Sequence, residues 1–245
     1  QAGCSAAAVT RIWVINPNTT QAMTTKIEDC ARAVAGADVS VTGVTSETGP
    51  ESIESHYDEA LSVPGVLKAV RRGEREGVDG YVIACFGDPG LDAARELASG
   101  PVIGIAEAAM HTASHLGRGF SVVTTLKRTI GRATDLAERY GMQRFCCGIH
   151  ACEIPVLELD TDPDARKVIM EACRDAVEAD GSDAVVLGCA GMADMCSEIS
   201  AELGVPVIEG VAAATLTVRS LVAMGLRTSK RGEFATPPPK AYTAG

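Results

Sequence analysis

Short apolar runs alternate with longer amphipathic stretches along most of the chain. The apolar runs have the length of buried strands and lie at residues 12–15, 39–44, 81–85, 102–105, 120–123, 149–157, 184–189 and 207–208. The stretches between them have apolar positions at helical spacing and lie at residues 20–35, 61–76, 91–98, 106–116, 132–140, 164–179, 194–203 and 212–224. This alternation predicts an α/β fold with mainly parallel sheets flanked by helices.

The same signals recur in the two halves of the chain. An aspartate stands six residues before a cysteine in the runs 79–85 and 183–189, and both cysteines end a predicted strand. A Pro-Val-Ile run follows each of them, at residues 101–103 and 206–208. The repeat predicts two pseudo-symmetric lobes, each with a four-stranded sheet, facing each other across a shared site.

We expect the first lobe to contain two separate segments of the chain and the second lobe to contain one. We assign residues 10–100 and 208–230 to the first lobe, residues 101–207 to the second lobe, and residues 1–9 and 231–245 to extended termini. Three consecutive prolines in the C-terminal segment exclude a helix or a central strand there. The N-terminal segment lacks the basic-then-apolar order of a secretory signal.

Composition excludes several classes of function. The 245 residues carry a formal net charge of −10, from 22 basic and 32 acidic side chains, and no run of Lys or Arg exceeds two residues. This balance disfavours nucleic-acid binding and a polybasic membrane anchor. No stretch approaches the roughly 18–20 apolar residues of a membrane span. Aromatic residues make up only 4% of the chain, which disfavours a surface that stacks on carbohydrate.

The nine cysteines are an odd number and include no CxxC pair. A disulfide scaffold and a zinc ribbon both require a different arrangement. We therefore expect free thiols in a reducing compartment and a cytoplasmic location. Most of these cysteines are expected to be small packing residues, namely Cys30, Cys146, Cys147, Cys152, Cys173 and Cys196.

Cys85 and Cys189 are different, because ligands of parallel α/β sheets bind beyond the carboxyl ends of the strands. A glycine-containing turn follows each cysteine, so main-chain N–H groups can approach a ligand closely. Asp88 fits the N-cap of the next helix and Pro89 its first position. A helix N-terminus beside a thiol is expected to lower the thiol pKa from about 8.5 toward neutrality.

Two thiols on opposite sides of one carbon suit stereoinversion. One cysteine, as thiolate, removes a proton from one face, and the other, as thiol, protonates the opposite face. The sequence contains no Walker motif and no G-x-G-x-x-G motif, so neither a nucleotide nor another cofactor is expected. A cysteine at a strand end is often only a packing residue, but its recurrence at the same repeat position favours the catalytic interpretation.

A second cluster has the spacing of a metal site. His111 and His115 are four residues apart on a predicted helix, one turn after Glu107. The HExxH order is absent, so we assign no metal to them. His150 and the acidic segment 158–164 are likewise interpreted as structural, since the segment lacks the order of a calcium loop.

The motifs at residues 14–20, 83–91 and 186–192 resemble those of the aspartate/glutamate racemase superfamily, in its hydantoin and allantoin racemase branch. The resemblance extends from Arg11 to about Ser229 and includes further matches at residues 50–54, 57–60 and 101–109. It implies two Rossmann-like lobes, a homo-oligomer, and a two-base mechanism without a cofactor in which Cys85 and Cys189 are catalytic. His56 after Ser55 departs from the pattern expected for the branch.

The resemblance also implies a substrate, a five-membered cyclic ureide that is either allantoin or a 5-monosubstituted hydantoin. Loss of its C5 proton gives an enolate that needs hydrogen-bond donors. The candidate binding residues are Phe86, Gly87, Ala190 and Gly191 through main-chain N–H groups, Asn16, Thr124 and Thr125 through side chains, Phe86 and Ile53 through the shape of the pocket, and Pro17. Asn16 and the threonines are equally suited to turns and caps.

Two other functions remain open at this point. A decarboxylase of the same superfamily would protonate an enolate with a single cysteine. A two-lobed binding protein would close on a small metabolite without chemistry. Deuterium incorporation at C5 with inversion separates the racemase from both alternatives.

Overall fold

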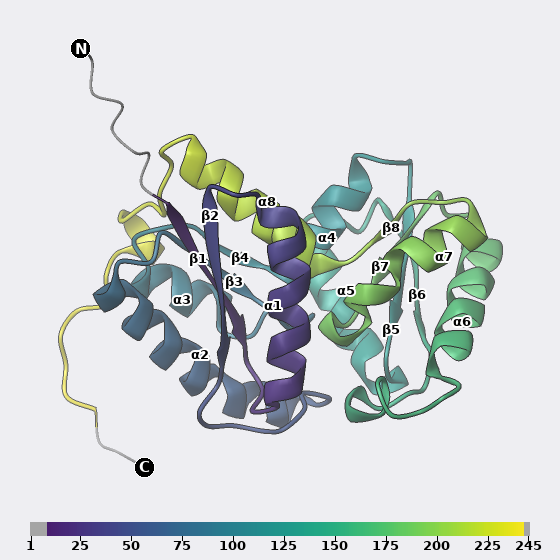
Figure 1. The fold of residues 1–245 in the computed structure, drawn as a ribbon, viewed down its shortest axis with the longest axis horizontal. Helices are drawn as coiled ribbons and strands as arrows, with labels where there is room; N and C mark the ends of the chain where they lie inside the picture. The colour runs from purple at the N-terminus through teal and green to yellow at the C-terminus, as the bar shows by residue number, and fades with distance from the viewer. Residues whose placement is uncertain (1–8, 243–245) are drawn as a thin grey trace.

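The computed structural model describes residues 9–242, which form two parallel sheets covered by helices (Figure 1). The strands are β1 (Thr10–Asn16), β2 (Val39–Thr45), β3 (Gly80–Ile83), β4 (Val102–Gly104), β5 (Phe120–Thr124), β6 (Cys146–Ala151), β7 (Ala184–Leu187) and β8 (Val207–Ile208). The α-helices are α1 (Gln21–Ala35), α2 (His56–Glu76), α3 (Leu91–Leu97), α4 (Ile105–Ser114), α5 (Ile130–Arg139), α6 (Ala165–Asp180), α7 (Cys196–Leu203) and α8 (Gly210–Ala223). Short 3₁₀ helices lie at η1 (Lys127–Thr129), η2 (Val156–Glu158), η3 (Ala190–Met195) and η4 (Gly232–Phe234).

The two sheets have the same strand order. The first runs β2-β1-β3-β4 and the second β6-β5-β7-β8, and every pairing in both is parallel. The predicted fold class, two pseudo-symmetric α/β lobes with four-stranded sheets, is therefore confirmed.

Both faces of the first sheet are buried, as expected for parallel strands. Along β1, Ile12 and Val14 pack on one face with α1 and α8, whereas Trp13 and Ile15 pack on the other face with α2 and α3. Side chains alternate between the faces of a strand, so one apolar run supplies both cores.

The last helix of each repeat, α4 or α8, packs against the sheet of the other lobe. After β4 the chain crosses over, and Ala106, Ala109 and Met110 of α4 pack in one cluster with Phe120 and other residues of the second sheet. After β8 it crosses back, and α8 packs against the first sheet and α1. The two crossovers run side by side between the lobes, where α4 and α8 are in contact.

Strand pairing places the division between the lobes differently from the predicted boundaries. The strand β4 pairs with β3, so it belongs to the first sheet and not to the segment 101–207. Ile208 pairs with Val186 of the second sheet, although the boundary placed it in the first lobe. Both differences arise because the crossover from one lobe to the other takes place at the start of a helix, after the strand is complete.

Several predicted elements have boundaries that are wrong by two residues or more, including the following three. The strand predicted at 149–157 ends at Ala151, because Glu153 has a left-handed φ of +59° and Pro155 follows it. The helix predicted at 61–76 starts at His56, where Ser55 accepts a hydrogen bond from the Asp58 N–H, and it includes Pro64. The helix predicted at 194–203 is α7, which starts at Cys196 after the 3₁₀ helix η3.

The predicted termini are described only in part. Residues 1–8 and 243–245 lie outside the described residues. In the predicted extended C-terminal segment, η4 forms one 3₁₀ turn, and residues 235–242 contain neither helix nor strand. Within residues 9–242 no helix combines the length and the apolar character needed to cross a membrane.

Candidate active site

A cavity that is partly open to solvent lies beyond the carboxyl ends of the central strands. Both lobes contribute to its wall. The lining residues are Asn16, Asn18, Met23, Ile53, Glu54, Ser55, His56, Glu59, Ala84, Cys85, Phe86 and Gly87 from the first half of the chain, and Thr124, Thr125, Arg128, Thr129, Arg132, Ala133, Val156, Gly188, Cys189 and Ala190 from the second.

Cys85 and Cys189 both line this cavity and are partly exposed to it. Each stands two residues beyond the end of its strand, β3 or β7. The residue before each cysteine extends the sheet in the same way, because the Ala84 N–H donates to the Ile15 carbonyl and the Gly188 N–H to the Val123 carbonyl, both at 2.8 Å. The repeat thus brings two equivalent thiols from opposite lobes to one cavity.

The thiol pKa values are opposite to the sequence-based expectation. Burial raises the pKa of Cys85 to about 12, against the stabilising N–H of Gly87, and the carboxylates of Asp88 and Glu59 act in the same direction as burial. Burial raises the pKa of Cys189 to about 11, although the Gly191 N–H and the Lys26 charge lower it. The prediction that these thiols have near-neutral pKa values is wrong. Burial destabilises each thiolate by more than the main-chain N–H groups of the following turn stabilise it.

Asp88 does not cap the helix that follows it. Its φ of +46° turns the chain, and Gly90 takes the N-cap position of α3, which starts at Leu91. The buried carboxylate instead accepts hydrogen bonds from the N–H groups of Ala106 at 3.1 Å and Glu107 at 2.9 Å. Asp88 therefore caps α4, whose own N-cap residue is a glycine, and Pro89 is not the first residue of a helix.

Most of the predicted binding residues line the cavity. Asn16, Ile53, Phe86, Gly87, Thr124, Thr125 and Ala190 do so, whereas Pro17 and Gly191 do not. The amide nitrogen of Asn16 donates to Asn18 Oδ1 at 2.7 Å and to Thr24 Oγ1 at 3.0 Å. Thr124 shares a hydrogen bond of 2.9 Å with the Thr129 hydroxyl. These bonds favour the turn-and-cap interpretation for Asn16 and Thr124.

Asn18 is a candidate that the sequence reasoning passed over. Its Oδ1 accepts from Asn16 and from the Thr20 N–H, while its amide nitrogen donates to the sulfur of Met23, at 3.2 Å, and to no other group among residues 9–242. A thioether is a weak acceptor, so this amide group retains donor capacity toward a ligand. The only signal in the sequence is its place in the same Asn-Pro-Asn turn as Asn16.

The charged rim of the cavity was not predicted either. Glu59 of α2 accepts a hydrogen bond of 2.6 Å from Nη2 of Arg132 in α5, and the same nitrogen donates to the Gly87 carbonyl at 2.7 Å. Nε of Arg132 is buried without a hydrogen-bond partner among the described residues. Burial raises the pKa of Glu59 despite the neighbouring Arg132. Glu59 and Arg132 are 73 residues apart, so no local pattern connects them.

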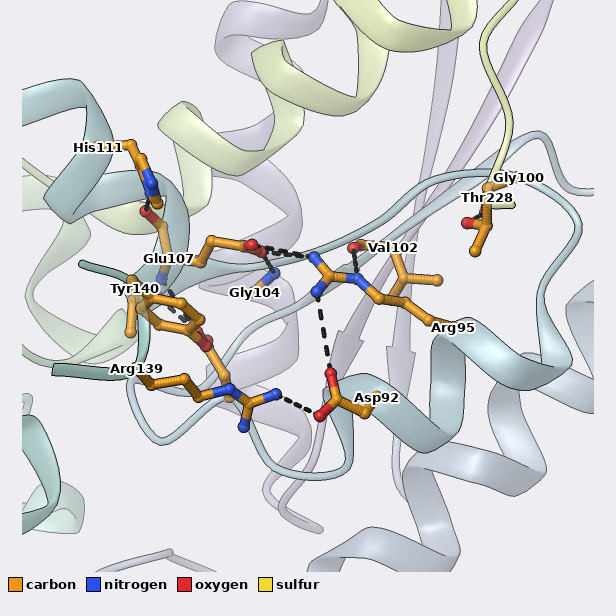
Figure 2. Close-up of polar contacts among 12 residues, drawn as sticks. Asp92, Arg95, Gly100, Val102, Gly104, Glu107, His111, Arg139, Tyr140 and Thr228 are labelled. Atoms are coloured by element: carbon orange, nitrogen blue, oxygen red, sulfur yellow. Dashed lines mark hydrogen bonds and ion pairs between the residues drawn. The ribbon is translucent and has the colours of Figure 1, made fainter. Parts of the chain in front are cut away.

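The histidine and glutamate side chains with metal-like spacing make other contacts, as Figure 2 shows. The Glu107 carboxylate accepts two hydrogen bonds from Nη2 of Arg95, at 2.8 and 3.0 Å. The His111 ring forms a 2.8 Å hydrogen bond with the Glu107 main-chain carbonyl. No cluster of three or more His, Cys, Asp or Glu side chains able to hold a metal ion occurs within residues 9–242.

Comparison with known proteins agrees with this fold. The family model for Asp/Glu/hydantoin racemase matches residues 12–218. A hydantoin racemase of Pseudomonas sp. (strain NS671) is 46% identical over 233 residues, which cover 95% of this chain and 94% of that protein. The solved structure of an allantoin racemase from Klebsiella pneumoniae has a TM-score of 0.94 at 51% identity and covers 96% of both chains. An allantoin racemase from Pseudomonas fluorescens has a TM-score of 0.92 at 38% identity and covers 96% of this chain and 100% of that one.

These matches define an isomerase of the racemase class with two α/β lobes. The chain belongs to the Asp/Glu/hydantoin racemase family. The family resemblance stated from the sequence motifs is thereby confirmed.

Proposed function

We propose that this protein is a cofactor-independent racemase of a five-membered cyclic ureide, in which Cys85 and Cys189 transfer protons at C5 on opposite faces of the ring. The observation that carries the proposal is the position of the two repeat-related thiols on one cavity, one from each lobe. Relatives that act on such rings, an allantoin racemase and a hydantoin racemase, support the substrate class.

The reaction needs one thiolate and one thiol. The thiolate takes the C5 proton, and the electron pair of the C–H bond moves into the ring as an enolate with its charge on the adjacent carbonyl oxygen. The opposite thiol then donates its proton to C5 and becomes the thiolate, so the product is the other enantiomer. A thiolate with a high pKa is strongly basic, as the deprotonation of a weak carbon acid requires, but only a small fraction of each thiol is ionised at neutral pH.

The enolate oxygen requires donors that are in place before the reaction. The turns after the two cysteines bring Phe86, Gly87 and Ala190, each with a main-chain N–H, to the cavity wall. The amide nitrogen of Asn18 adds a side-chain donor on the same cavity. We assign the ring oxygens to these groups, in place of Gly191 and Asn16.

The wall outside the cysteines favours a polar 5-substituent. Glu54, His56 and Arg128 all line the cavity, and the Arg128 side chain forms no ion pair with any described residue. A ureido group has donors and an acceptor that match carboxylate, imidazole and guanidinium groups, whereas a benzyl group can form no hydrogen bond with any of them. Allantoin is therefore proposed as the substrate, in preference to alkyl or aryl hydantoins.

The alternatives fit the site less well. A decarboxylase requires only one cysteine as proton donor, and a binding protein requires none. Two equivalent thiols on the same cavity favour racemisation over both functions.

The test is enantiopure allantoin in heavy water, followed by polarimetry and by NMR of the C5 proton. Racemisation above the uncatalysed rate, with deuterium at C5 of the inverted product, is expected. Cys85→Ser and Cys189→Ser should each reduce this rate at least 100-fold, the lower end for loss of a general acid or base. The exposed thiol of Cys147 provides the control, since Cys147→Ser should keep full activity. Full activity in either of the first two variants would refute the two-base assignment.

A further inference from the structure

The turn after each cysteine is held by a cation from the other lobe. Nη2 of Arg132, on α5 of the second lobe, donates to the Gly87 carbonyl at 2.7 Å. Nζ of Lys26, on α1 of the first lobe, donates to the Gly191 carbonyl at 2.6 Å. Both glycines stand two residues after a cysteine, so the two contacts are equivalent in the repeat although the cations are not equivalent in sequence.

Each cation is also fixed by carboxylates of the lobe it reaches into. Glu59, on α2 of the first lobe, accepts from Arg132 at 2.6 Å. Asp160 and Asp194, both in the second lobe, lie 2.7 and 2.8 Å from the Lys26 nitrogen. The side chains of Lys26 and Arg132 are only 20% and 27% exposed. Shielding of this kind makes charge-assisted hydrogen bonds stronger than those of exposed pairs.

We propose that Lys26 and Arg132 are matched positioning residues, each of which holds the cysteine turn of the opposite lobe so that the two sulfur atoms keep a fixed separation across the cavity. The inference rests on the proposed function, because it assumes that Cys85 and Cys189 are the acid and the base. Neither cation needs to touch the substrate for this role.

Each cation affects its cysteine through the glycine whose carbonyl it binds. The N–H groups of Gly87 and Gly191 stabilise the thiolates of Cys85 and Cys189, respectively. The carbonyl of the same glycine belongs to the next peptide plane, so a hydrogen bond to it limits how far the whole turn, and with it this N–H, can move relative to the sulfur. A displacement of about 1 Å at a reacting group can cost about 100-fold in rate, so anchoring both turns has a direct catalytic effect.

The two contacts also have distinct electrostatic effects. The charged or titratable groups that face Cys189 are Lys26, which lowers its pKa, and Cys152 and Glu54, which raise it. Those that face Cys85 are Cys189, Asp88 and Glu59, all of which raise its pKa. Loss of Lys26 should therefore raise the pKa of Cys189 alone. Loss of Arg132 should leave the Glu59 charge uncompensated and raise the pKa of Cys85 alone.

The experiment measures the reactivity of each thiol separately. The full-length chain is treated with iodoacetamide over a range of pH, and alkylation of the peptides that contain Cys85 and Cys189 is followed by mass spectrometry. In Lys26→Met, alkylation of Cys189 should slow at least about threefold at a given pH, while the rate at Cys85 stays within twofold. In Arg132→Met the pattern should be reversed. Equal changes at both thiols in each variant, or no change at either, would overturn the proposal.

Racemisation provides the second readout. The kcat/KM for the two enantiomers must fall together, because their equilibrium constant is one, and a loss of about 10- to 100-fold is expected for each Met variant. Lys26→Arg and Arg132→Lys keep the charge, so their kcat/KM should be within about fivefold of the value for the unmodified protein. Unchanged kcat/KM in both Met variants would contradict the positioning role.

The matched control is Arg174→Met, which removes an exposed ion pair with Glu202; neither of these residues lines the cavity. In this variant, the alkylation rates of both thiols and the kcat/KM should stay within twofold of the values for the unmodified protein. If Cys85→Ser and Cys189→Ser remain fully active, the proposed function fails, whereas the alkylation pattern still decides separately whether each cation acts on the opposite turn.

Discussion

The Tyr140 hydroxyl donates a hydrogen bond of 2.6 Å to Oδ2 of Asp88, which connects the end of α5 in the second lobe to the turn that follows Cys85. Asp88 is 1% exposed, and the same carboxylate caps α4 through two N–H groups. The buried Asp88 side chain therefore connects the turn after Cys85 to α4 and, through Tyr140, to the second lobe.

Removal of the Asp88 carboxylate should destabilise the protein. Asp88→Ala leaves the N–H groups of Ala106 and Glu107 and the Tyr140 hydroxyl without this acceptor, at a cost of about 3 kcal/mol or more. Tyr140→Phe removes a single donor and should cost about 1 kcal/mol. Urea unfolding monitored by circular dichroism gives both values. The double variant should lose less than the sum of the single losses, because the two side chains share a hydrogen bond; full additivity would show that the bond contributes little.

Gly104 is expected to tolerate no side chain. A Cβ atom there would lie 2.2 Å from the carboxyl carbon of Asp88, which three hydrogen bonds hold in place. Gly104→Ala should therefore reduce the free energy of unfolding by more than about 2 kcal/mol. Gly131 on α5 is the matched control, since a Cβ atom there would meet no heavy atom within 4 Å. Gly131→Ala should be neutral or stabilise by up to about 1 kcal/mol, and a similar loss in both variants would contradict the steric explanation.

The position of Cys85 and Cys189 on one cavity was predictable because their signal is local and occurs twice. Each follows a short apolar strand and precedes a glycine turn, and strand ends of parallel sheets converge on ligand sites. The helix cap was mispredicted for a related reason. An Asp-Pro pair before a helix is a local cap signal, but in this fold the Asp88 carboxylate reaches α4, a contact that no local pattern contains.

The rest of the site depends on contacts between the lobes. Glu59 and Arg132 meet only when α2 and α5 face the same cavity, and Lys26 reaches Gly191 across 165 residues of sequence. The raised thiol pKa values have the same origin, since burial by both lobes outweighs the turn dipoles that the sequence suggested. Periodicity determines which face of a helix is apolar, but it contains no information on which polar side chains the packing brings together.

Arg128 should discriminate between substrates. If its guanidinium contacts a polar 5-substituent, Arg128→Met should raise the KM for allantoin about three- to tenfold, the effect of losing a partly exposed charge-assisted hydrogen bond. The KM for 5-methylhydantoin should stay within twofold, since a methyl group offers no acceptor. Initial rates from polarimetry provide both constants. The neighbouring Lys127 does not line the cavity, so Lys127→Met serves as the control, and an equal rise in KM for both substrates in Arg128→Met would exclude the proposed contact.

The raised thiol pKa values predict a steep alkaline activity profile. Catalysis needs one thiolate and one thiol, and with pKa values of about 12 for Cys85 and about 11 for Cys189 both groups are protonated at neutral pH. Raising the pH therefore increases the active form, and kcat/KM, which reports groups of the free enzyme, should rise about tenfold per pH unit from pH 7 to pH 9. Polarimetric rates, corrected for uncatalysed racemisation at each pH, measure this slope. A plateau between pH 7 and pH 8 would instead show that the turn dipoles and Lys26 outweigh burial, and that a near-neutral thiolate performs the deprotonation.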